Sequence, residues 1–396
     1  MENRLTVDNA LHKYTFVFIM LFGMSYIPLD GPAGFGIVKL VLMGGMIVLS
    51  LVYCFRVTKA LVWGVIYLLY QYITASFHPE TWRWSTLLFS TSFVLTYVAF
   101  YNMVYVAKVF SLDFFIKICR WVIITYFVVC IVQQCFVLAG FSYFPLVNLW
   151  KVLDRGIGCN SLSMEPSTFA RTMLVWYYAY VKCQEYKGGV GPFSVRELFY
   201  GEHKKITLCF LWMMCSMGSG TAFVCLIAFS LYFVRKSNFY FVVPLLILLY
   251  IGLNMLEFEQ LNRATSVINA TTTMDQATVE AADGSAASRI SPLLNSFHAD
   301  FSKSETWFGK GIDYAVNHNL ILTQKATLFD DYGFLFYILT LCFNFSCGYR
   351  FWSLATLFMF MGVGGTSGGN IHYLWELMMI MTCVRYFYEN RFTQSV

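Results

Sequence analysis

This sequence contains few charged residues. Asp, Glu, Lys and Arg make up 12% of its 396 residues, about half the share of a soluble domain. Apolar residues reach 58% and aromatic residues 19%. So little charge excludes a water-soluble enzyme and a disordered protein, and it predicts a polytopic membrane protein.

The sequence also lacks the patterns of a metal site or a disulfide framework. No CxxC pair occurs among its 12 cysteines, and most of them lie inside apolar segments, where cysteine serves as a small apolar side chain. A Walker loop, a GxGxxG element and a GxSxG element are absent as well. We therefore expect no metal and no cofactor.

Apolar segments predict one all-α membrane domain, residues 1–396, with about 12 transmembrane helices, since one crossing needs about 20 apolar residues. The charge-free run from Ile206 to Val234 is interpreted as two short helices joined at the Ser216–Thr221 turn, because basic pairs flank both ends. The other ten segments are 14–29, 35–55, 60–76, 84–107, 118–143, 166–182, 237–256, 332–347, 350–363 and 371–389.

The basic residues fall mainly on one side of this predicted topology. The short loops on the opposite side hold only Arg83, Lys151 and Arg155. Since Lys and Arg in short loops mark the cytoplasmic side, both termini are predicted to be inside. This bias also accounts for the net charge of +5 without a nucleic-acid partner.

Two outside loops are predicted, a shorter one at 144–165 and a long one at 257–331. The long loop is the most polar stretch of the chain, and loops of this length are usually functional or disordered. Ser291-Pro292 is a helix-start signal. Apolar residues at helical spacing follow up to Phe301, which predicts a short amphipathic helix on the outer membrane face.

Ionisable residues near membrane depth are candidates for a functional site. Glu165 and Arg171 flank the start of a span, where a capping acid and a snorkelling arginine are the simpler interpretation. Arg263 and Arg289 in the long loop suit a pyrophosphate, which arginine binds in a bidentate manner; two solvated loop arginines are the alternative.

One histidine of the long loop is a candidate general base. His318 lies between two asparagines, which suits a general base near neutral pH, although most loop histidines are ordinary surface residues. His372 and Glu376 in the last span are interpreted either as support for the site or as an internal hydrogen-bonded pair.

The order of these features resembles the Wzy-type O-antigen and exopolysaccharide polymerases, a superfamily shared with the O-antigen ligases. The resemblance covers about Arg155 to the C-terminus. It rests on motifs in a fixed order: Arg155 to Gly158, Glu165-Pro166-Ser167, the Ser216–Thr221 hinge, Gly284 to Arg289, Gly309 and Gly311, His318-Asn319, and Asp331 with Gly333.

The resemblance implies a GT-C-like, inverting, metal-independent glycosyltransferase of the bacterial inner membrane, with both outside loops periplasmic. The implied donor and acceptor are undecaprenyl-pyrophosphate-linked glycans, and a chain-length regulator is a further expected partner beside membrane lipids. His318, Arg289 and Arg155 are the expected catalytic residues. The expected substrate-binding residues are Glu165, Arg171, Arg263, Asn319, Asp331 and His372.

Two other functions remain open from the sequence. An O-antigen ligase would use the same donor with a lipid A-core acceptor. A transporter of lipid-linked glycans would carry out no chemistry, and such proteins tend to show repeats and broken helices at mid-membrane.

Overall fold

The computed structural model describes residues 37–54, 56–109, 111–141, 157–163, 165–189, 192–233, 299–318, 324–350 and 372–390. Every regular element in these ranges is helical, as predicted. The elements are α2 (Ile37–Cys54), α3 (Lys59–Phe77), α4 (Trp84–Tyr105), α5 (Leu112–Leu138), α7 (Pro166–Gly188), α8 (Val195–Leu198), α9 (His203–Ser216), α10 (Gly220–Ser230), η2 (Leu231–Phe233), α15 (Ser304–Phe308), α16 (Tyr314–Asn317), α17 (Gln324–Cys347) and α19 (His372–Glu389).

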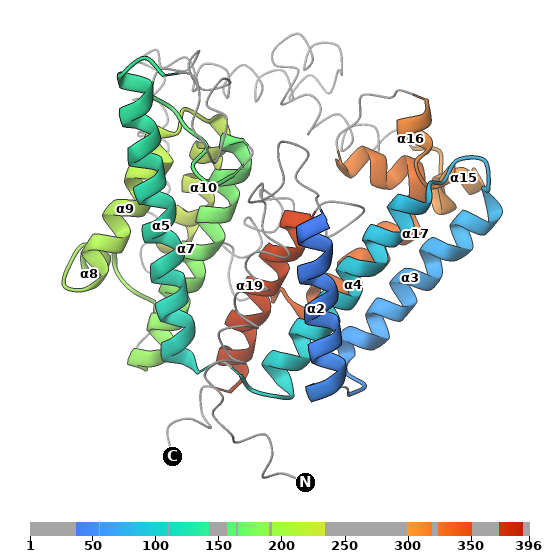
Figure 1. The fold of residues 1–396 in the computed structure, drawn as a ribbon, viewed down its shortest axis with the longest axis horizontal. Coiled ribbons are helices and arrows are strands. Elements are labelled where there is room, and N and C mark those ends of the chain that lie inside the picture. Colours follow the sequence, from blue (N-terminus) through green and yellow to red (C-terminus); the bar gives the residue numbers. More distant parts are fainter. Residues whose placement is uncertain are drawn as a thin grey trace.

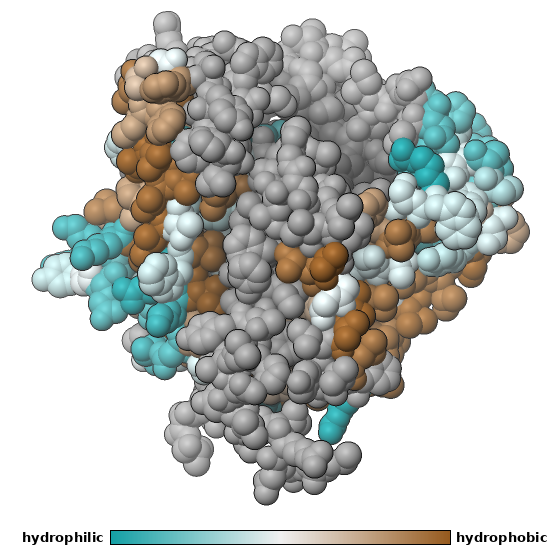
Figure 2. All heavy atoms as spheres, viewed as in Figure 1, coloured by the Kyte–Doolittle hydropathy of each residue, from teal (hydrophilic) through white to brown (hydrophobic). Residues whose placement is uncertain are grey.

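Three described helices, α3, α4 and α5, are long and apolar enough to cross a membrane. The outward faces of α3 and α5 are apolar as well, and Figure 2 shows hydrophobic surface along both flanks of the molecule. These exposed side chains recur at helical spacing: Val62, Val65, Ile66, Leu69 and Ile73 on α3, and Trp121, Ile124, Val128 and Val132 on α5. Such stripes suit lipid rather than water, as expected of an integral membrane protein.

The predicted total of 12 spans is not decided by the described residues. Segments 14–29 and 237–256 lie outside them, as does nearly all of 350–363. The span predicted at 118–143 begins earlier, at Leu112, because Ser111 caps the helix by accepting a hydrogen bond from the Phe114 amide. The span predicted at 166–182 continues to Gly188 and ends at Gly189, which has a positive φ.

The helices form two groups, with α5, α7, α9 and α10 on one side and α2, α3, α4 and α17 on the other (Figure 1). Helix α19 packs against both α7 and α4. Its fully buried Trp375 has ring centroids of Tyr67, Tyr97 and Phe343 within 6.0 Å. This aromatic core joins α3, α4, α17 and α19.

The predicted helical hairpin at 206–234 is confirmed. Helices α9 and α10 are separated by the turn at Met217–Ser219, where Gly218 has a positive φ. Their Phe210 and Phe229 rings lie 5.8 Å apart. At the open ends, the His203 ring lies 5.0 Å from Phe193, and the Tyr232 hydroxyl accepts a hydrogen bond from the Phe193 amide. The start of α9, where Lys204 and Lys205 lie, and Phe233 at the end of η2 are therefore at the same end of the hairpin.

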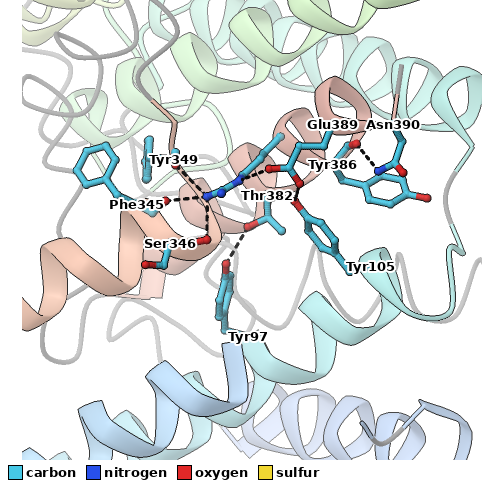
Figure 3. A network of polar contacts seen from close by, with 10 residues as sticks. Tyr97, Tyr105, Phe345, Ser346, Tyr349, Thr382, Tyr386, Glu389 and Asn390 are labelled. Carbon is cyan, nitrogen blue, oxygen red and sulfur yellow. Dashed lines mark hydrogen bonds and ion pairs between the residues drawn. The ribbon is translucent and has the colours of Figure 1, made fainter. Parts of the chain in front are cut away.

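One end of the bundle gathers the basic residues of the helix termini, and we call it the basic end. Three ion pairs or hydrogen bonds across helices define it: Lys187 with Asp113, Arg120 with Glu202, and Tyr105 with Glu389. Arg385 donates to the carbonyl groups of Phe345, Ser346 and Tyr349 at the end of α17, and to the Glu389 carboxylate (Figure 3). These carbonyl groups have no partner within the helix, so Arg385 closes α17.

Candidate functional site

The opposite end of the bundle, which we call the loop end, holds residues 299–318 against two helices. This docked loop contacts the α3–α4 turn and the bend of α17 at Gly333, where φ is 79° and ψ is 177°. A Cβ atom on Gly333 would lie 2.4 Å from the Gly309 nitrogen and 2.4 Å from the Trp307 carbonyl oxygen. The bend and the loop therefore approach backbone to backbone, which only glycine permits.

Two more glycines bring the loop close to its neighbours. A Cβ on Gly309 would lie 2.4 Å from the Asp331 carbonyl oxygen, and one on Gly311 would lie 2.5 Å from the Thr81 hydroxyl. The Gly311 amide donates to the Asp331 carbonyl at 3.1 Å, and the Lys310 amide donates to the Asp330 carbonyl at 2.7 Å. The Gly-x-Gly motif of Gly309 and Gly311 thus allows the loop to pack closely against α17 and the α3–α4 turn.

A buried carboxylate fixes the loop to the start of α4. Asp313, 4% exposed and with a φ of 62°, accepts the Arg83 backbone amide at 3.0 Å and the Arg83 guanidinium at 3.2 and 3.3 Å. The Thr86 hydroxyl lies within 2.9 Å of both carboxylate oxygens. The carboxylate is bidentate to arginine and sits at the N-terminus of α4, so charge-assisted hydrogen bonds hold the loop at this helix start.

Two acidic side chains stabilise the positive charge of Arg83. The Asp313 hydrogen bond, followed by the charges of Asp313 and Asp331, raises the Arg83 pKa above its usual value despite partial burial. Asp331 was predicted to bind substrate. In the structure it is buried, with 3% of its surface exposed. Its carbonyl holds Gly311 and its charge acts on Arg83, so the described contacts give Asp331 a part in seating the loop.

Lys310, Tyr314 and His318 form a row on the docked loop. The Lys310 ammonium lies 3.1 Å from the Asp330 carboxylate and 5.2 Å from the centroid of the Tyr314 ring. Partial burial acts to lower the Lys310 pKa, but the hydrogen bond and charge of Asp330 outweigh it and raise the pKa overall. The His318 imidazole stacks on Tyr314, with ring centroids 4.0 Å apart.

The contacts of His318 determine its tautomer. Its Nδ1 lies 2.9 Å from the Tyr314 carbonyl oxygen. A carbonyl oxygen only accepts, so Nδ1 carries the proton, and Nε2 of the neutral ring keeps its lone pair. Asn317, one of the two asparagines that flank His318, donates its side-chain amide to the Thr81 carbonyl. The His318 side chain is exposed.

Glu165 and Arg171 lie at the start of α7. The last turn of this helix is at the basic end, so its start is at the loop end. The predicted helix start is confirmed, with Pro166 in the first turn and Glu165 in the N-cap position. The Glu165 carboxylate makes no cap to the backbone; it accepts the hydroxyls of Ser167 and Thr168. Arg171 lies near the Cys225 thiol of α10.

His372 is the first residue of α19. Glu376, one helical turn further on, is 5% exposed and accepts the Trp176 indole N–H at 3.4 Å. One partner of this buried carboxylate therefore comes from α7, across the packed core, and joins α19 to that helix. The His372 side chain lies outside the described part of the chain.

Four predicted site residues, Arg155, Arg263, Arg289 and Asn319, lie outside the described residues. The helix predicted from Ser291 does so as well, except for its last turn. There, Phe301 lies in a turn and packs edge-on against Trp307 at 5.6 Å.

Sequence analysis missed Arg83, Asp313, Lys310 and Tyr314 as members of one cluster. A signal was present for Arg83, because it is one of few basic residues in the short loops of its side. Its partner Asp313 is 230 residues away, and no local pattern joins them. No protein-family model, curated protein or solved structure matches the chain.

Proposed function

We propose that this protein is a membrane glycosyltransferase that polymerises undecaprenyl-pyrophosphate-linked oligosaccharide repeat units. The polymer is O-antigen, capsule or exopolysaccharide, and the reaction inverts the anomeric centre without a metal. The proposal includes about 12 spans in a GT-C-like arrangement in the bacterial inner membrane. The order of motifs from Arg155 to Gly333 suggests it, and the docked loop supports it.

One observation carries the proposal: the His318 imidazole donates through Nδ1 to a backbone carbonyl and stacks on Tyr314, which leaves Nε2 available as a base. In glycosyl transfer an acceptor hydroxyl must lose a proton as it attacks the donor sugar. His318 takes that proton at Nε2.

The departing pyrophosphate needs positive charge where its negative charge develops. Lys310 supplies one such charge two turns before His318 on the same loop, and Arg289 and Arg155 supply the others. Arg171 and Arg263 hold further phosphate oxygens, Glu165, Asn319 and His372 border the sugars, and Asp331 supports the loop that carries His318.

Charge supports the proposed orientation. Lys187, Arg120 and Arg385 lie at the end opposite to His318, which supports a cytoplasmic basic end and a periplasmic His318. Lipid-linked repeat units meet a polymerase on that side.

The test combines a deletion strain with a transfer assay. Loss of long chains with single repeats retained supports a polymerase, whereas loss of all glycan from lipid A-core indicates a ligase. Purified protein is then given a lipid-linked glycan donor with either a lipid-linked repeat or lipid A-core as acceptor. If no new glycosidic bond forms with either acceptor while glycan export still depends on the chain, the protein is a transporter and the proposal fails.

A further inference from the structure

The segment 157–163, which leads into α7, forms no helix, yet its residues 158–161 and 163 are buried. It lies along one face of α5, where Tyr126, Cys130 and Gln133 follow one another at helical spacing. The Ser161 hydroxyl donates to the Tyr126 carbonyl at 2.7 Å, and the Gln133 side-chain amide donates to the Ser161 carbonyl at 2.8 Å. Irregular backbone at this depth needs such partners, because lipid offers none.

Between these two hydrogen bonds, the segment brings two thiols together. The Cys159 Sγ atom lies 3.1 Å from the Cys130 Sγ atom, and both residues are fully buried. A disulfide has an S–S distance of about 2 Å. The sulfur atoms thus need to approach by about 1 Å for a bond to form.

A metal site is a poorer interpretation of this pair. Structural zinc takes four ligands from the protein. Within the described ranges, no group of three His, Cys, Asp or Glu residues converges on a common point. Two thiols in contact with no third ligand beside them favour a covalent bond between the sulfurs.

We propose that Cys130 and Cys159 form a disulfide bond in the mature protein. The two thiols lose two protons and two electrons, and a protein disulfide oxidant accepts them as its own disulfide is reduced to a dithiol. The proposal rests on the periplasmic orientation of the loop end in the proposed function, because such oxidants act outside the cytoplasm. Since both sulfurs are buried, the bond forms before segment 157–163 is fully seated on α5.

The bond fixes a strained part of the chain. Ser161 has a φ of 48°, a left-handed conformation that is unfavourable for a residue with a Cβ atom. A covalent link two residues earlier holds this conformation against α5. It also limits the movement of the start of α7, which begins at Pro166, seven residues after Cys159.

The experiment counts thiols in the full-length protein taken from native membranes. Free thiols are blocked with N-ethylmaleimide under denaturing conditions, either directly or after reduction, and the labelled cysteines are counted by intact mass. We expect two fewer labels on the 12 cysteines without reductant than with it. A non-reducing digest should contain the peptide of Cys130 joined to that of Cys159.

Three variants make the result specific. Cys130→Ser and Cys159→Ser should each abolish the two-label difference. Cys119→Ser should keep it, because Cys119 is equally buried on the same helix but lies toward the basic end. Reductant should lower the midpoint of thermal unfolding of the wild type and leave that of Cys159→Ser unchanged.

The proposal is overturned if all 12 cysteines are labelled without reductant. It is overturned as well if the two-label difference persists in both Cys130→Ser and Cys159→Ser, since a different pair would then be joined. The measurement involves no glycan. A chain with no polymerase activity would still give the same thiol count, so failure of the proposed function is recognised separately.

Discussion

At the basic end, Arg385 closes α17 by donating to three carbonyl groups of that helix and its C-terminal turn. At the loop end, Arg83 instead holds a carboxylate from a loop that lies 230 residues further along the chain. The first arginine is 15% exposed and the second 51%. One end thus completes helices that are already packed, while the other holds a separate loop in place.

Because of this difference, mutations that remove a contact should have different effects at the two ends. Loss of a contact at the basic end leaves helix carbonyls unsatisfied within the packed bundle, which lowers the stability of the whole protein. Loss of a contact at the loop end frees the docked loop and leaves the helices packed, since local opening requires less free energy than global unfolding. The predictions below test this contrast, from the largest expected effect to the smallest.

His318→Ala should reduce polymer formation by about 10²–10⁴-fold, the usual contribution of a general base. Its side chain is exposed, so the midpoint of thermal unfolding should stay near that of the wild type. Both are measured on purified protein with a lipid-linked repeat as acceptor. His203→Ala, at the basic end, is the control and should form polymer at a rate close to that of the wild type. Near-normal transfer by His318→Ala would show that the loop end does not hold the base.

Gly333→Ala should release the docked loop. The bend conformation is open only to glycine, and the added Cβ would collide with backbone atoms of Gly309 and Trp307. We expect a loss of about 3 kcal/mol or more in loop docking, seen as trypsin cleavage after Lys310, which mass spectrometry detects.

Gly140→Ala is the matched control for backbone strain. Gly140 has a φ of 82°, but nothing lies within 4 Å of an added Cβ, so only a strain of about 1–2 kcal/mol is expected. Equal cleavage after Lys310 in the two variants would contradict the close approach of loop and bend.

Arg385→Met should lower stability by about 2–4 kcal/mol, because it leaves carbonyl groups at the end of α17 without their side-chain donor and removes the ion pair with Glu389. Arg83→Met should have a smaller effect on global stability and a larger one on cleavage after Lys310. Thermal unfolding and proteolysis are measured on both variants. A global destabilisation by Arg83→Met as large as that by Arg385→Met would remove the distinction between the ends.

The smallest expected effect is a pH dependence at the basic end. Burial lowers the pKa of His203, which precedes the apolar part of α9 and lies 3.0 Å from the Tyr180 hydroxyl. Since the unfolded state binds the proton more readily, stability should fall as the pH falls below about 6.5. His203→Asn should show a weaker fall between pH 7 and pH 5 in thermal unfolding. A steeper fall in that variant would contradict the assignment.

Sequence patterns were sufficient where one helix could be considered alone. Apolar length located α3, α4 and α19 to within a few residues, and the basic pairs around 206–234 predicted the α9–α10 hairpin. Helix ends were less well predicted in α5 and α7, where charged first and last turns continue the helix beyond the apolar stretch. Those turns form ion pairs with each other, such as Lys187 with Asp113, which a count of apolar residues does not include.

Composition and charge by themselves therefore determined an all-helical membrane protein, because burying backbone in lipid requires helices of a given length. They also placed His318 in a polar loop beside a helix. Only the tertiary structure decided that Tyr314 sets the imidazole tautomer, that Asp313 docks the loop on Arg83, and that Cys159 meets Cys130. The contacts of Asp313 with Arg83 and of Cys159 with Cys130 join residues far apart in the chain, and their geometry depends on how whole helices pack.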